Sequence, residues 1–140
     1  MTYDPKKPTH FVLMRTDLPD YQPGKSMAQS NHAGTAMVVD ALMNEHPYRK
    51  QFLTWLNEGG GKFGTCIVKG VTHRQLLEHL ELTHHLGLIA GPVVDTEYPI
   101  RDGHTVTFAN VLTCGYVFGP RGRCDLAVGE LPLFRDDNDG

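Results

Sequence analysis

The stretch Gly24-Lys-Ser-Met-Ala-Gln-Ser-Asn-His-Ala33 is the most informative part of this chain, because it opens a helix whose polar residues fall on one side. It follows a strand-like run, His10–Arg15, and a short loop rich in Pro, Gly and Asp. Positions i, i+4 and i+7 of a helix share a face, so Lys25, Gln29 and His32 point the same way. The helix is otherwise apolar nearly all round, as is usual for a buried helix. The three polar residues are therefore predicted to form one wall of a site.

Lys25 is placed unfavourably for the stability of this helix. A cation in the first turn opposes the helix dipole, at a cost of about 0.3–1 kcal/mol where it is exposed. The free N–H groups of a helix start also favour a bound anion. Taken singly, a solvated lysine, a surface glutamine and a satisfied histidine would be ordinary, but together they favour a functional site. We expect removal of Lys25 to leave stability unchanged or slightly raised.

The rest of the chain alternates strands with helices. Strands are predicted at about 10–16, 64–69, 88–94 and 113–118, and helices at about 24–45, 48–58 and 73–86. Segment 104–112 is interpreted as either an added strand or an extended loop. Pro47 can stand in the first turn of the second helix, which the glycines 59–61 end. Thr72 and Gly87 are typical caps of the third helix. This alternation indicates a three-layer α/β/α sandwich.

A run from Arg15-Thr-Asp-Leu18 into Gly-Lys-x-x-Ala-Gln-x-x-His-Ala resembles the peptidyl-tRNA hydrolases of the archaeal and eukaryotic type (type II). Further similar segments follow in order at Thr65–Lys69, Gln75–Leu88, Val93–Asp95, Tyr116–Pro120, Asp125-Leu and Leu131–Phe134. The resemblance implies a mixed sheet of about four strands with helices on both faces. It also implies a hydrolase that needs no cofactor and cleaves the ester between a peptide, or an N-blocked amino acid, and the 3′ end of tRNA.

The same comparison adds Asp95 to the candidate site. In the family this Asp is followed by Ala-Gly-Arg-Thr, and the Asp, the Thr and the helix Lys are the usual catalytic candidates. Here the text is Asp95-Thr-Glu-Tyr-Pro99, so the Asp matches but Pro99 stands at the position of the Thr. Thr96 or Thr105 is expected to supply the hydroxyl and to contact the substrate, and the sequence leaves open which. The loop from Asp95 to Thr113 is also longer than in the family.

The expected chemistry is ester hydrolysis by positioning and electrostatics. Lys25 would stabilise the developing oxyanion or steer the 3′ end, and Asp95 would orient Lys25 or accept a proton from the attacking water. Gln29 would hydrogen-bond the substrate or a water. His32 is either a base, since its ordinary pKa is near neutral, or a positioning group. We expect the Lys25 ammonium to lie within one bridging water of the Asp95 carboxylate.

Charge is unevenly spread along the chain. Residues 1–75 hold nine Lys and Arg against six Asp and Glu, whereas residues 76–140 hold four against ten. The net charge of −3 is not typical of a nucleic-acid binder, which usually presents a basic surface. If tRNA binds, we therefore expect it on the N-terminal half. The candidate contacts there are Arg15, Lys25, Arg49 and Lys50, whereas Lys6 and Lys7 are interpreted as ordinary surface charges.

Composition predicts a cytoplasmic globular protein. The 140 residues suit an N-terminal extension over 1–9, a single domain over 10–134 and an acidic, disordered tail over 135–140. The N-terminus has no apolar signal region, and no apolar run reaches the ~20 residues of a membrane span. Cys66 and Cys114 lie in apolar runs and are interpreted as core thiols, which suits a reducing compartment.

Other site types lack their motifs. His73, His79, His84 and His85 include no helical i, i+4 zinc pair, so we expect no metal. Neither a G-x-S-x-G nucleophile motif nor a phosphate-binding P-loop is present.

Two other functions remain open. The missing Ala-Gly-Arg-Thr favours a non-catalytic module that binds RNA or protein on the same fold, and a hydrolase of a different ester or amide is the third alternative. A homodimer is also left open.

Overall fold

The computed structural model describes residues 3–58 and 61–135. Its elements, in chain order, are β1 (Pro8–Arg15), α1 (Pro23–Met43), α2 (Arg49–Leu56), β2 (Cys66–Val71), α3 (His73–His85), β3 (Ile89–Asp102), β4 (Thr105–Pro120) and α4 (Arg121–Val128). The strands form one mixed sheet in the order β2-β1-β4-β3. β1 is parallel to β2 and antiparallel to β4, and β4 is antiparallel to β3. The predicted α/β fold and its four-stranded mixed sheet are confirmed.

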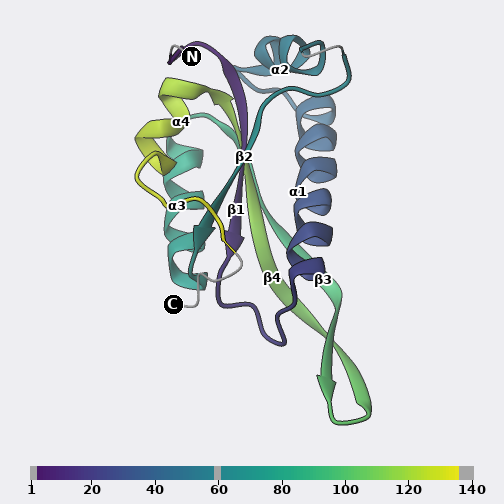
Figure 1. Cartoon of the computed structure of the whole chain (residues 1–140). Helices are drawn as coiled ribbons and strands as arrows, with labels where there is room; N and C mark the ends of the chain where they lie inside the picture. The colour runs from purple at the N-terminus through teal and green to yellow at the C-terminus, as the bar shows by residue number, and fades with distance from the viewer. Residues whose placement is uncertain (1–2, 59–60, 136–140) are drawn as a thin grey trace.

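Helices cover both faces of the sheet (Figure 1), with α1 on one face and α3 and α4 on the other. Successive residues of a strand point to opposite faces. Val12 and Met14 accordingly lie in the core under α1, while Phe11 and Leu13 lie in the core under α3 and α4. Burial on both faces explains why β1 is a nearly continuous apolar run. Within the described residues, no helix has the length and hydrophobicity needed to cross a membrane.

The predicted N-terminal cap of α3 is confirmed. Thr72 accepts a hydrogen bond from the Gln75 backbone amide, and the Gln75 side chain accepts one from the Thr72 amide, which completes a capping box. At the other end the C-cap is Leu86, and Gly87 follows it with φ at 72°. A left-handed residue at this position is the usual helix ending, and glycine adopts it without steric cost.

Several expectations about helices were wrong. α2 begins at Arg49, so Pro47 precedes the helix, and α2 ends at Leu56, before the glycine run. Gly59 and Gly60 lie outside the described residues, as do residues 136–140 of the expected acidic tail. α1 buries only one stripe and leaves apolar side chains such as Met27 and Met43 exposed, because only the side of α1 that faces the sheet and α2 is covered. No helix was expected at α4, whose Arg-Gly-Arg start hides the periodicity of its buried residues.

The prediction that Cys66 is a core thiol was wrong, because Cys66 is exposed, whereas Cys114 is buried as expected. Cys66 opens β2, which is an edge strand, so only one neighbouring strand covers it.

The segment with two alternative interpretations, 104–112, is a strand. It pairs with the second half of β3 to form a long hairpin, which turns at Gly103 with φ at 62°. Figure 1 shows this hairpin projecting beyond the sheet. The β3–β4 register shifts between Val93 and Val94 and again between Asp95 and Tyr98, so Asp95 lies where the hairpin leaves the sheet.

Candidate active site

A buried hydrogen-bonded chain joins α1 to the base of the hairpin. Gln29 is only 3% exposed, and its amide nitrogen donates to Oδ2 of Asp95 at 2.7 Å. The hydroxyl of Thr113 donates to Oε1 of Gln29, also at 2.7 Å. A hydroxyl donor on one side and a carboxylate acceptor on the other fix which way the amide points. Residues from α1, β3 and β4 therefore hold the Asp95 carboxylate in one orientation.

The other oxygen of Asp95 serves the local backbone. Oδ1 accepts a hydrogen bond from the Glu97 amide at 2.8 Å, in the manner of Asp residues that shape turns. Both carboxylate oxygens thus have a partner within the protein. Each oxygen has a second lone pair, which leaves the group able to accept a proton from a water or a substrate.

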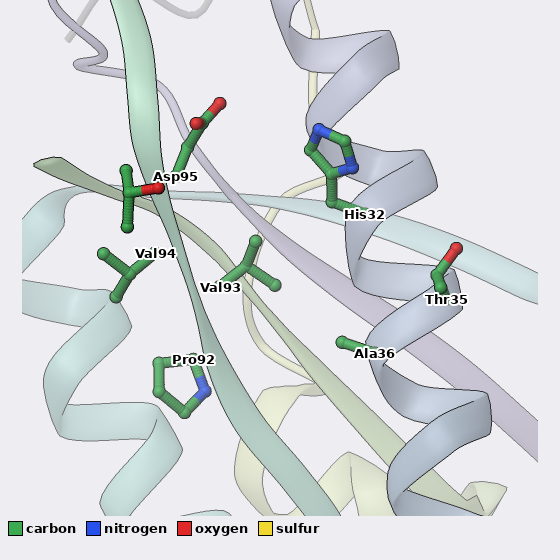
Figure 2. A pocket seen from close by; sticks show the side chains of 8 residues that line it. His32, Thr35, Ala36, Pro92, Val93, Val94 and Asp95 are labelled. Atoms are coloured by element: carbon green, nitrogen blue, oxygen red, sulfur yellow. The ribbon is translucent and has the colours of Figure 1, made fainter. Parts of the chain in front are cut away.

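A cleft of about 470 Å³ opens beside this carboxylate. His32, Thr35 and Ala36 of α1 form one wall, and residues 92–96 of β3 form the other. Figure 2 shows Asp95 and His32 at the same end of the cleft, carried by facing elements. Small-molecule sites usually measure 300–1,000 Å³, so the cleft has the size of a binding site. The structure thereby brings together three predicted site residues, His32, Asp95 and Thr96, with Gln29 bonded behind them.

Lys25 has other partners. Its ammonium donates to the backbone oxygen of Asp20 at 2.6 Å, to Oδ2 of Asp20 at 3.1 Å and to the Pro99 oxygen at 2.8 Å. It also lies over the Tyr98 ring, 4.7 Å from its centre. An ammonium has three N–H donors, and these three acceptors match them. The carboxylate that meets Lys25 is thus Asp20, and a water-bridged contact with Asp95 stays a prediction.

Asp20 ties the loop before α1 to the hairpin. Its Oδ2 accepts from the Arg101 backbone amide at 3.0 Å as well as from Lys25. The Arg101 amide, and after it the Lys25 ammonium, hold the pKa of Asp20 below its ordinary value. A carboxylate with these donors stays charged near neutral pH. The Lys25–Asp20 pair therefore fastens the first strand of the hairpin, at Pro99 and Arg101, to the start of α1.

Arg15 and Thr105 do not line the cleft. The Arg15 guanidinium donates to the Asp17 carboxylate at 2.9 Å and to the Leu112 backbone oxygen at 2.9 Å, which fastens the end of β1 to β4. Thr105 is exposed at the far end of the hairpin, where it pairs with Asp102. Of the two threonines considered for the missing hydroxyl, only Thr96 borders the cleft.

The sequence interpretation missed Thr113, which is fully buried and contacts Gln29. The signal was present in the sequence, because Thr113 begins a run that is otherwise apolar over most of its length, Thr-Cys-Gly-Tyr-Val-Phe118. A hydroxyl in a buried strand must find a hydrogen-bond partner. That requirement marks it as a residue with a specific contact, although the sequence does not say with which one.

No group of three or more His, Cys, Asp or Glu side chains that could hold a metal occurs among residues 3–58 and 61–135.

Comparison with known families assigns the chain to one of them. The family described as peptidyl-tRNA hydrolase PTH2 matches residues 9–134, which span all eight helices and strands except the first residue of β1. The chain belongs to the peptidyl-tRNA hydrolase PTH2 family. No curated protein sequence matches it. In this PTH2 chain Pro99 contributes a backbone oxygen to Lys25.

Proposed function

We propose that this chain hydrolyses the ester bond between a peptide, or an N-blocked amino acid, and the 3′ end of tRNA, and that it does so in the cytoplasm. Membership of the PTH2 family supports the reaction class. The observation that carries the assignment to residues is the 2.7 Å bond from Gln29 to Asp95 at the edge of a cleft of suitable size. Such a bond holds an acceptor carboxylate ready beside the space where an ester would lie.

In the proposed mechanism Asp95 accepts a proton from a water in the cleft. The water oxygen then bonds to the ester carbon, and the bond from that carbon to the ribose oxygen breaks as the ribose oxygen takes up a proton. His32, at the same end of the cleft, is placed to deliver that proton. Thr96 borders the cleft and is placed to hydrogen-bond the substrate.

Lys25 has a positioning role in this mechanism. Its ammonium holds Asp20 and the Pro99 oxygen, and so fixes the start of the hairpin just after Asp95. Because its three donors already have acceptors, a direct contact with the oxyanion would require it to leave Asp20.

Thr113→Val tests the hydrogen-bonded chain. Valine has nearly the same shape but leaves the buried Gln29 oxygen without its donor, which should cost about 1–3 kcal/mol of stability. The amide would also be free to turn over, so we expect kcat to fall about 10-fold, on the order of one lost orienting hydrogen bond. Thr113→Ser is the control, because it keeps the hydroxyl, and its kcat should stay near that of the wild type. An unchanged kcat in Thr113→Val would show that the chain does not position Asp95.

The direct test of the function is turnover of purified N-acetyl-aminoacyl-tRNA. We expect KM to rise steeply with salt while kcat changes little, because contacts with phosphates release counterions. Lys50→Ala should raise KM if α2 is part of the tRNA surface. Binding that stays flat between low and physiological salt, together with absent turnover, would instead favour the protein-binding module.

A further inference from the structure

A second hollow lies on the other side of α1 from the cleft. It measures about 490 Å³ and is bounded by α1, by Trp55 at the end of α2 and by the segment from Lys62 to Cys66. Thr35 borders both hollows, so α1 is the wall that separates them. We call this second hollow the α1–α2 groove. The candidate active site described above does not use it.

The α1–α2 groove is mostly apolar and carries an unusually exposed aromatic ring. Phe63 lines it and is 65% exposed, although a phenylalanine gains most from burial. Trp55 and His10, whose ring centres lie 6.0 Å apart in an edge-to-face arrangement, add two further aromatic rings. Ser30 and Asn31 of α1 supply hydrogen-bonding groups to the opposite wall.

His10 is itself unusual. It is 3% exposed, and no described residue is a hydrogen-bond partner of its Nε2 atom. Buried polar side-chain atoms nearly always have a partner, either in the protein or in a bound water or ligand. Burial lowers the pKa of His10 to about 4, so the ring is neutral at physiological pH. A neutral ring suits a site that takes up an aromatic ligand.

Lys62 has a backbone conformation that is unfavourable for a lysine. Its φ is 85°, a value that glycine adopts readily and lysine rarely, and it follows Gly61 with φ at 96°. Among the described residues that line the groove, Lys62 is the only one with a permanent charge, and within the described part of the chain it has no ion-pair partner. A lysine kept where glycine would fit better, beside an exposed phenylalanine, points to an anion that comes from outside the protein.

We propose that the α1–α2 groove binds an unpaired nucleobase of single-stranded RNA. The base stacks on Phe63, Asn31 and Ser30 meet its edge, and Lys62 binds the adjoining phosphate. Stacking on an aromatic side chain combined with a nearby cation is how proteins bind single strands without a basic surface over the whole molecule.

This inference rests on the proposed function, because the 3′ end of tRNA is single-stranded. A base upstream of the esterified nucleotide would lie in the groove, while the ester itself reaches the cleft across α1 at Thr35. The two hollows would then lie about the width of one helix apart, ~10–12 Å. An apolar peptide is the other conceivable occupant, but it would gain nothing from Lys62.

The test uses the trinucleotide CpCpA as the probe and Trp55 as the reporter. Trp55 is the only tryptophan of the chain, and it lines the groove, so its fluorescence should change saturably as CpCpA binds. Phe63→Ala should weaken CpCpA binding about 5- to 100-fold and raise KM for N-acetyl-aminoacyl-tRNA in proportion. Phe63→Tyr keeps the stacking face and should bind like the wild type. Phe108→Ala is the matched control, because Phe108 is 66% exposed but lies on the hairpin, away from the groove.

Lys62→Gly supplies an independent readout. Glycine suits the positive φ, so the melting temperature of Lys62→Gly should stay the same or rise. CpCpA binding should weaken, and the slope of log affinity against log salt concentration should fall by about 1, the share of one phosphate contact. A drop in melting temperature with unchanged binding would make Lys62 structural and overturn its role.

The outcomes separate this proposal from the proposed function. If the wild type hydrolyses the tRNA substrate but Phe63→Ala changes neither CpCpA affinity nor KM, the groove proposal is wrong and the hydrolase stands. If CpCpA binding depends on Phe63 while the wild type hydrolyses nothing, the groove is an RNA site and the hydrolase proposal fails. A saturable change in Trp55 fluorescence on addition of an apolar peptide, with no change on addition of CpCpA, would assign the groove to protein binding and overturn the proposal.

Discussion

Asp95→Asn should remove most of the hydrolysis of N-acetyl-aminoacyl-tRNA, lowering kcat by about 10²–10⁴-fold, the usual contribution of a positioned proton acceptor. The asparagine keeps the size of the side chain, and its oxygen can still accept the hydrogen bond from the Glu97 amide, so the turn should persist. Its NH2 group would face the Gln29 amide nitrogen and cannot replace the acceptor that Gln29 loses. The asparagine cannot take a proton from water. We therefore expect the loss to appear in kcat and in the single-turnover rate, with stability lowered only by the lost Gln29 hydrogen bond, about 0.5–1.5 kcal/mol.

Glu97→Gln is the matched control for this change. Glu97 lies two residues further along β3 and is exposed, and it contributes its backbone amide rather than its carboxylate to Asp95. The same neutralisation at Glu97 should leave kcat near the wild-type value. Equal, measurable turnover in Asp95→Asn and the wild type would exclude Asp95 as the proton acceptor, whereas absence of turnover in the wild type itself would favour a non-catalytic member of the family.

Lys25→Ala should lower both stability and turnover. The position of Lys25 in the first turn of α1 predicts neutral or raised stability on its removal, but the structure places its ammonium against Asp20 and the Pro99 oxygen. Loss of these charge-assisted hydrogen bonds should lower the melting temperature. The hairpin base would loosen with it, so kcat should fall as Asp95 loses its fixed place.

Two further variants separate positioning from direct catalysis. Lys25→Met keeps an unbranched side chain but removes the ammonium, which lies over the Tyr98 ring, so it isolates the effect of the charge. Asp20→Asn weakens the pair from its other partner without touching the ammonium. If Lys25 acts through Asp20, the effects of Lys25→Met and Asp20→Asn on kcat should be non-additive in the double variant. If instead Asp20→Asn leaves kcat intact while Lys25→Met abolishes it at unchanged melting temperature, Lys25 acts on the substrate directly.

In the candidate site, the helical spacing predicted which residues share a face but not what each of them contacts. The helical spacing of Lys25, Gln29 and His32 placed all three on α1 correctly, but their environments differ, since Gln29 is buried and His32 is exposed beside the cleft. The spacing identifies a shared face, whereas the partner of each side chain depends on which strand packs against that turn. Lys25 meets the hairpin and Gln29 meets Asp95 for that reason.

The contacts of Thr113 and Asp95 depend on residues that lie far apart in the sequence. The bond from Thr113 to Gln29 joins residues 84 positions apart, and the bond from Gln29 to Asp95 joins residues 66 apart. Both depend on the β3–β4 register, which shifts twice near Asp95. A shift of one residue in a strand sends each following side chain to the opposite face, so no local pattern could have placed Asp95 beside the cleft.

The amino-acid sequence by itself determined the order of the four strands and the first three helices, the N-terminal cap of α3 and the face of α1 that carries the polar residues. Those features follow from periodicity and from hydrogen bonds between residues a few positions apart, which the sequence displays directly. The tertiary structure alone decided that Asp20 meets Lys25, that Thr113 orients Gln29 and that Lys62 and Phe63 border a groove beside α1. These contacts join distant segments, and they exist only because the sheet fixes the strands in one register and packs α1 against them.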